Sequence, residues 1–184
     1  MPERDLPPIL REKDHRAPSA FTPESLLREA RRQKAADFRP VPEVCILDPD
    51  GDIVRRLKSE NRARLHRDWV CYHTELHVFE EDGMEFGIIG CAVGSSFAVL
   101  LAEELFVSGC QLLINLTSSG QLLDVQPPPY FILVDRAYRD EGTSYHYLPP
   151  SDYCEAPSAL LERLEEAFGN LEVDVLRGAT WTTD

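Results

Sequence analysis

The sequence predicts an α/β fold with a mixed, largely parallel central sheet flanked by helices, and three observations carry this prediction. Apolar runs with strand character alternate with helical patterns along the chain. The runs at residues 44–47, 111–116 and 130–134 are almost continuously apolar, as in strands buried on both faces. Residues 86–122 read strand, Gly/Ser turn, apolar helix, strand and polar turn, which is the order of a βαβ unit.

The first half of the chain contains clear sequence signals for a helix start and for a hairpin turn. Thr22, Pro23 and Glu24 supply an N-cap, a first-turn proline and an acid near the positive end of the helix dipole, so we expect a helix to about Gln33. Asp82-Gly83 is typical of a hairpin turn. The remaining elements expected here are a strand at 44–47, a turn at 48–52, a helix at 53–62 and strands at 69–79 and 84–91.

The second half continues the alternation. A helix is expected from about Ser96 to Val107, because Gly109 is a favourable residue just beyond a helix end. The three prolines at 127–129 predict a rigid extended segment. The other expected elements are buried strands at 111–116 and 130–134, an amphipathic helix at 157–168 closed by Gly169, and a strand at 173–176.

Length and charge limit the classes of protein that fit. The 184 residues are enough for one domain, predicted over residues 21–184 after a charged, flexible arm of residues 1–20. The formal net charge of −13 repels phosphate backbones, so we expect no nucleic-acid partner. No apolar stretch reaches the roughly 20 residues of a membrane span, and the charged N-terminus is unlike a signal peptide. We therefore expect no membrane association and a cytoplasmic location.

No metal site is expected. The five cysteines share no metal-ligand spacing and are interpreted as reduced structural residues. Residues 48–52 are acidic, but the glycine and glutamate positions of a calcium loop are not matched, so they are interpreted as a solvated turn. His73 and His77 are expected on one face of a strand, without a third ligand.

Two small-residue turns are candidates for a ligand site. Residues 90–96 fit a turn whose backbone N–H groups and following helix face an anion, and they fit an ordinary structural turn as well. Residues 117–120 place three hydroxyls at the end of a strand, where they suit phosphate or ribose oxygens. We expect both turns at the ends of neighbouring inner strands, forming one pocket. The charged loop at 139–144 fits either a substrate-side loop or a solvated one.

Several segments, in this order and spacing, resemble the nucleoside phosphorylase / uridine phosphorylase family. They are residues 46–54, the turn at 90–94 with Glu103, Glu104 and Leu105 on the next helix, and residues 115–120, 139–147 and 177–184. The resemblance implies a three-layer αβα domain that transfers the glycosyl group of a nucleoside from the base to phosphate. It covers about the first two thirds of a family domain.

The resemblance also implies a set of site residues. It assigns Asp50 and Gly51 to the turn that packs against phosphate, and Ser118 to the hydroxyl that touches phosphate and ribose. Gly94 lies in the turn beneath the sugar, and Asn115 takes the place of a phosphate-binding arginine. Ile53 stands where a further arginine is expected, and Tyr72 and His73 lie near the place of a third. No residue is carried over as catalytic.

The implied function is phosphorolysis of a nucleoside to base and ribose 1-phosphate, with phosphate as co-substrate and no other cofactor. Because the arginines are replaced, two alternatives stay open. One is a nucleosidase that uses water, and the other is a non-catalytic nucleoside-binding or oligomer-contact module. The chain ends at Asp184, before the family's base-recognition and ribose-gripping residues, so base preference is not predicted. We expect either a truncated fragment or a chain that relies on tight self-association, as a homo-oligomer such as a dimer or a hexamer built of dimers.

Overall fold

The computed structural model describes residues 7–11, 13–169 and 172–182. They fall into two compact units, one of residues 18–119 and the other of residues 7–11, 13–17, 120–169 and 172–182. Each unit has its own sheet, and both sheets contain parallel and antiparallel pairs. Strands and helices alternate along the chain, so the predicted mixed α/β fold class is confirmed. No helix among the described residues is long and apolar enough to cross a bilayer.

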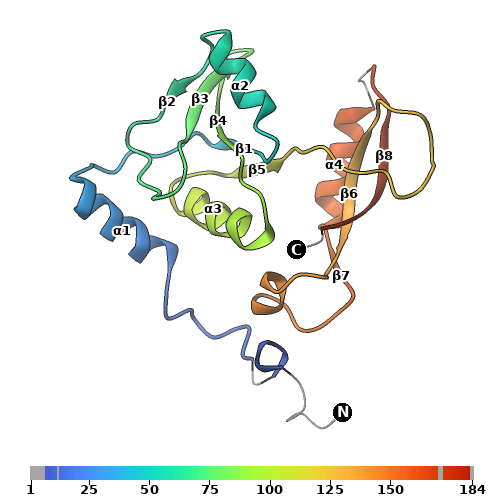
Figure 1. Ribbon diagram of the computed structural model, residues 1–184, viewed down its shortest axis with the longest axis horizontal. Coiled ribbons are helices and arrows are strands. Elements are labelled where there is room, and N and C mark those ends of the chain that lie inside the picture. The colour runs from blue at the N-terminus through green and yellow to red at the C-terminus, as the bar shows by residue number, and fades with distance from the viewer. Residues whose placement is uncertain (1–6, 12, 170–171, 183–184) are drawn as a thin grey trace. The chain divides into compact units, whose positions relative to one another are not determined.

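The unit of residues 18–119 contains a five-stranded sheet in the order β2-β3-β4-β1-β5 (Figure 1). Strand β1 is parallel to both of its neighbours, β4 and β5, whereas β3 is antiparallel to β2 and β4. The parallel strands therefore end at one edge of the sheet, with Gly90 opposite Asp48 in register. The strands are β1 Val44–Asp48, β2 Arg64–Leu65, β3 His77–Glu81, β4 Met84–Gly90 and β5 Leu112–Asn115.

Helices cover both faces of this sheet. Side chains alternate between the two faces along each strand, so successive residues of β1 pack against different helices. Cys45 and Leu47 of β1 pack in one buried cluster with Leu101 and Leu105 of α3 (Ser95–Val107). Ile46, between them, belongs to the cluster built on α2 (Asp52–Ser59). The result is the expected three-layer order of helix, sheet and helix.

Helix α1 (Pro23–Lys34) begins where the sequence predicts. The Thr22 hydroxyl accepts a hydrogen bond from the Ser25 N–H at 3.3 Å, which caps the first turn. The helix ends at Ala35 in the left-handed conformation, with φ of 49°. The hairpin between β3 and β4 also turns as predicted, since Asp82 and Gly83 both have positive φ.

The predicted strand at residues 69–79 is wrong over most of its length. Only the part from His77 onward forms a strand, and Trp69, Val70, Cys71 and Leu76 are buried as loop side chains. Apolar residues in such a loop give the same sequence pattern as a strand, because burial rather than pairing makes them apolar. Helix α2 also ends earlier than expected, at Ser59, and Asn61 follows with φ of 54°.

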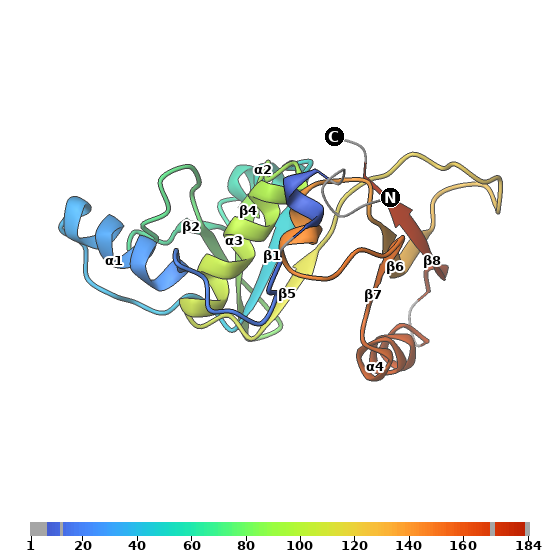
Figure 2. The ribbon, with the colours of Figure 1, turned by 90° about the horizontal axis from the view of Figure 1, so that it is seen from below.

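The second unit contains a three-stranded sheet in the order β7-β6-β8 (Figure 2). Strand β6 is central, parallel to β8 and antiparallel to β7. Residues of the N-terminal segment contact the 3-10 helix η3: His15 Nε2 lies 3.3 Å from the Tyr145 carbonyl oxygen. The elements are η2 Pro8–Leu10, β6 Phe131–Tyr138, η3 Thr143–His146, β7 Tyr153–Glu155, α4 Ser158–Phe168 and β8 Val175–Trp181.

Two strands that were expected to be buried are not. Leu112 and Ile114 of β5 are 40% and 39% exposed, and Phe131 of β6 is 49% exposed. Strand β5 is the edge of its sheet, since β1 is its one partner among the described residues. An apolar strand sequence indicates that burial of the strand is favourable. It does not indicate whether another strand or helix packs against that strand in the fold.

Candidate functional site

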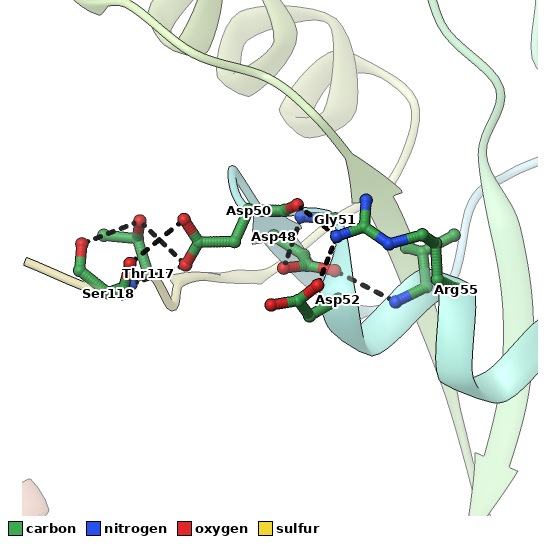
Figure 3. Close-up of polar contacts among 8 residues, drawn as sticks. Asp48, Asp50, Gly51, Asp52, Arg55, Thr117 and Ser118 are labelled. Atoms are coloured by element: carbon green, nitrogen blue, oxygen red, sulfur yellow. Dashed lines mark hydrogen bonds and ion pairs between the residues drawn. The ribbon is translucent and has the colours of Figure 1, made fainter.

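The candidate site lies at the edge where β4, β1 and β5 end, and Asp48 is its buried anchor. Asp48 is 1% exposed, and its carboxylate accepts hydrogen bonds from Gly51 N at 3.0 Å and Val54 N at 2.9 Å (Figure 3). Its backbone oxygen accepts a further bond from Cys91 N at 2.9 Å. Asp48 therefore caps α2 and ties the turn after β4 to the turn after β1.

Gly51 is required by the shape of this turn. Its φ of 73° lies in the left-handed region that glycine adopts without strain. A Cβ at this position would lie 2.6 Å from Cys91 Sγ and 2.8 Å from Arg55 Nη1. A Cβ on Gly90 would in turn lie 3.5 Å from Gly51 Cα. The two turns thus meet closely at the end of the sheet.

Asp50 links this turn to the hydroxyl-rich turn after β5. One of its carboxylate oxygens accepts a hydrogen bond from Ser118 N at 2.6 Å, and the other accepts one from Ser118 Oγ at 3.1 Å (Figure 3). The bond from the Ser118 N–H lowers the pKa of Asp50, with smaller contributions from the hydroxyls of Ser118 and Thr117. An ionised carboxylate therefore holds Ser118, whose hydroxyl the sequence resemblance assigns to phosphate and ribose.

Arg55 completes the polar group at this edge. Its Nη2 donates to the Asp50 backbone oxygen at 3.0 Å and also bonds the Asp52 carboxylate (Figure 3). The hydrogen bond with Asp52 raises the pKa of Arg55. Sequence reasoning did not select this arginine. Its position one helical turn after Gly51 is the signal that could have identified it, since residues four apart on a helix lie on one face.

Not all of the predicted site residues come together. The described contacts join Asp50, Gly51 and Ser118, but none of them joins Gly94 or Asn115 to this group. Gly94 precedes α3 with φ of 95°, and a Cβ there would meet nothing within 4 Å. Asn115 ends β5 opposite Leu47 of β1.

The expected relation between the two small-residue turns is also corrected. They follow β4 and β5, which are not neighbouring strands, because β1 lies between them. The turn after β1 fills the space between the other two, and Asp50 makes the contact to Ser118. The sequence order of the strands does not reveal that β1 is inserted between them.

A pocket of about 490 Å³ lies on the β4 side of this edge. It contains the side chains of Arg55, Lys58, Glu75 and two histidines. His73 and His77 do not lie on one face of a strand as expected, because the strand begins only at His77. Both nevertheless line the pocket. The full lining is Gly51, Val54, Arg55, Lys58, His73, Thr74, Glu75, His77, Gly90, Cys91 and Phe97.

The charged loop at residues 139–144 has a structural role. Arg139 is 5% exposed, and its guanidinium donates to the Pro149 carbonyl oxygen at 2.6 Å and to Ser151 Oγ at 2.7 Å. It also donates to Ser144 Oγ at 2.9 Å and lies over the Tyr145 ring. Arg139 therefore ties this loop to residues 148–151, and the loop is not fully solvated.

Potential metal ligands among the described residues are not clustered, and the cysteines differ in burial, since Cys91 is exposed. Within the described part of the chain, no three His, Cys, Asp or Glu side chains are grouped so that they could hold a metal ion. All five cysteines are free, and Cys45, Cys71 and Cys110 are buried. Burial raises the pKa of each of these three thiols, which makes them poor nucleophiles.

Comparison with solved structures identifies similar folds. A uridine phosphorylase from Vibrio fischeri ES114 superimposes with a TM-score of 0.66 at 23% identity, over 81% of this chain and 62% of the other. A purine nucleoside phosphorylase from Toxoplasma gondii, in complex with immucillin-H, gives a TM-score of 0.65 at 18% identity, over 78% and 58%. The chain thus spans about three fifths of these relatives' length. No curated protein matches it in sequence.

Similarity in amino-acid sequence identifies the family to which the chain belongs. The pattern that defines the phosphorylase superfamily matches residues 43–184, which is most of the chain and includes every element from β1 to β8. The matched range contains the Asp48 anchor and the link between Asp50 and Ser118. The chain therefore belongs to the phosphorylase superfamily.

Proposed function

We propose that this protein cleaves the N-glycosidic bond of a nucleoside and releases the free base, at the edge where β4, β1 and β5 end. Membership of the phosphorylase superfamily supports a nucleoside substrate. The observation that carries the proposal is the pair of hydrogen bonds from Ser118 to Asp50, which holds a carboxylate at the end of the parallel strands. A cytoplasmic, homo-oligomeric enzyme is part of the same proposal.

Water is the attacking group that suits this geometry. A phosphate ion is a mixture of monoanion and dianion near neutral pH and would meet the ionised Asp50 at the Ser118 donors. Ile53 and Asn115, which stand in the places of two arginines, are uncharged, and the nearby Arg55 is paired with Asp52. A water molecule can instead donate a hydrogen bond to Asp50, so this turn favours hydrolysis.

Hydrolysis replaces the base at C1′ with the oxygen atom of water. The bond between C1′ and the base nitrogen breaks, its electron pair leaves with the base, and the water oxygen bonds to C1′. One proton from the water ends on the base. The sugar carries positive charge in the transition state, and a fixed carboxylate nearby stabilises that charge. Asp50 has this electrostatic role and orients the water, because its lowered pKa makes it a weak base.

Phosphorolysis is the second candidate, and the names of the structural neighbours favour it. Both are phosphorylases, and their reaction would yield base and ribose 1-phosphate here. In that case phosphate would have to displace Asp50 from Ser118 or approach from another side of the turn.

One experiment separates these candidates. Purified protein is incubated with a panel of purine and pyrimidine nucleosides, with and without phosphate, and free base and sugar product are quantified by chromatography. Equal base release without phosphate, with ribose as product, supports hydrolysis. Release only with phosphate, with ribose 1-phosphate as product, supports phosphorolysis. Saturable nucleoside binding without any base release would contradict both candidates and support a binding module.

A further inference from the structure

The loop of residues 69–76 is held by two helices. Val70 lies in a buried cluster with residues of α1, and Cys71 lies in a second buried cluster with residues of α3. Lys34, the last residue of α1, donates from its ammonium group to the carbonyl oxygens of Val70 and Cys71, each at 2.9 Å. Contacts with α1 and α3 therefore set the position of this loop.

The same loop forms part of the pocket on the β4 side of the site. His73, Thr74 and Glu75 belong to the lining of this pocket. Within the loop, the indole N–H of Trp69 donates to the Thr74 hydroxyl at 3.0 Å, and Trp69 itself is buried. A displacement of the loop from α1 and α3 would therefore change one wall of the pocket.

Glu104 of α3 is a buried acid that faces this loop. It is 1% exposed, and its Oε2 has no hydrogen-bond partner among the described residues. Burial raises the pKa of Glu104. Three neighbouring groups each lower this pKa by less, namely Cys71 and His73 from the loop and Lys34 from α1. The arrangement in the structure therefore suits a neutral, protonated Glu104.

Ionisation of Glu104 would place a negative charge where no donor meets it. A buried charge without a partner is costly, so a nearby basic group is drawn toward it. Lys34 and His73 are the basic groups that act on Glu104, and both are connected to the loop. The Lys34 ammonium group donates to two loop carbonyls and not to Glu104 Oε2, so pairing requires it to shift. Pairing with His73 would move the pocket wall directly.

We propose that Glu104 is a proton-controlled switch that holds the loop of residues 69–76 when it is neutral and releases it when it ionises. In the held state Lys34 binds the two loop carbonyls, and the pocket wall has the form described here. The released state gains population as the pH rises and Glu104 loses its proton. This inference goes beyond the proposed function and does not depend on whether the protein cleaves nucleosides.

Amide hydrogen exchange at acid and at alkaline pH, corrected for the intrinsic exchange rate, tests the switch. Glu104→Gln is the test variant, because it keeps the shape of the side chain and cannot ionise. Glu103→Gln is the matched control at the adjacent, only half-buried position. Lys34→Gln is a second variant, since it removes the ammonium group that holds the loop carbonyls.

In the unmodified protein we expect the protection of residues 69–76 to fall by at least roughly tenfold between about pH 5 and about pH 8, and that of β1 to change by less than about twofold. Glu104→Gln should keep the protection that the loop has at acid pH, whereas Glu103→Gln should behave as the unmodified protein does. Lys34→Gln should show weak protection of the loop at both pH values.

Three results would overturn the proposal. The first is unchanged protection of the loop across this pH range in the unmodified protein. The second is an equal loss of protection in β1, which would show that the whole unit is destabilised rather than the loop released. The third is a loss of protection in Glu104→Gln as large as that in the unmodified protein. Because the measurement uses no nucleoside, none of these results bears on base release.

Discussion

The carboxylate of Asp50 accepts two hydrogen bonds from Ser118, one from its backbone N–H at 2.6 Å and one from its hydroxyl at 3.1 Å. The two residues are 68 positions apart in sequence, and the bonds close the gap between the turns after β1 and β5. A carboxylate thereby occupies the donors of Ser118. We expect this relationship to influence which attacking group reaches the proposed site.

Removing the charge of Asp50 tests its proposed role. Asp50→Asn keeps an oxygen acceptor for Ser118 but removes the negative charge, so we expect base release to fall by at least roughly tenfold. Asp52→Asn is the control, since it removes a neighbouring carboxylate that bonds Arg55 and not Ser118. Initial rates of base release compare the variants. Equal rates in Asp50→Asn and the unmodified protein would rule out the electrostatic role.

Asp50→Ala tests whether the carboxylate excludes phosphate. The substitution frees the N–H and hydroxyl of Ser118, so we expect base release to become faster when phosphate is added. In the unmodified protein we expect no such dependence. The measurement is the ratio of rates at high and zero phosphate, at fixed ionic strength. A ratio that stays at one in Asp50→Ala would show that other features exclude phosphate.

Replacing Gly51 by alanine should destabilise the fold more than the same change at Gly83. Both glycines have φ near 75°, but a Cβ on Gly51 collides with Cys91 and Arg55, whereas one on Gly83 meets nothing within 4 Å. We expect a loss of about 1 kcal/mol for Gly83→Ala and more than about 2 kcal/mol for Gly51→Ala. Chemical denaturation measures both. Equal losses would mean that Cys91 and Arg55 move aside without cost.

Glu104 gives a prediction about pH. It is 1% exposed in α3, its Oε2 has no hydrogen-bond partner among the described residues, and burial raises its pKa above 4.5. The folded state therefore holds this proton more tightly than the unfolded state. The stability that results is fully present below pH 4.5 and is lost as the pH rises through the folded pKa.

Glu104→Gln should remove the loss of stability that ionisation of Glu104 causes. We therefore expect the variant to be more stable than the unmodified protein at pH 7–8. Its free energy of unfolding should also fall less between acid and neutral pH. The free energy of unfolding, measured across this range, checks the prediction. Glu103→Gln is the control on the adjacent position, which is only half-buried. A pH dependence that is the same in Glu104→Gln as in the unmodified protein would contradict the prediction.

Self-association is expected from the exposed edge of β5. Leu112 and Ile114 project from one face of this edge strand and are 40% and 39% exposed. Light scattering after size exclusion should show a dimer or larger species, and Ile114→Lys should shift it toward the monomer. Met84→Lys, at an exposed position of β4, should have little effect. A monomer at all concentrations of the unmodified protein would contradict this expectation.

The sequence by itself determined those structural features that depend on a few adjacent residues. Thr22 and Pro23 start α1, and the Asp82-Gly83 pair turns the hairpin, because caps and tight turns depend on a few adjacent backbone groups. The order of apolar runs was sufficient for the α/β class, and the family resemblance rested on short segments such as residues 46–54 and 115–120 in their order and spacing. The apolar pattern was not sufficient for residues 69–76, where buried loop side chains have the same pattern as a strand.

Only the tertiary structure decided what the polar residues do. Strand β1 lies between β4 and β5, so Asp50 reaches Ser118, and Arg55, Lys58 and His77 converge on one pocket. The same topology makes β5 an edge strand and leaves its apolar face half-exposed. Such contacts join residues that are far apart in the chain, and their geometry depends on how whole strands and helices pack, which no local pattern of residues encodes.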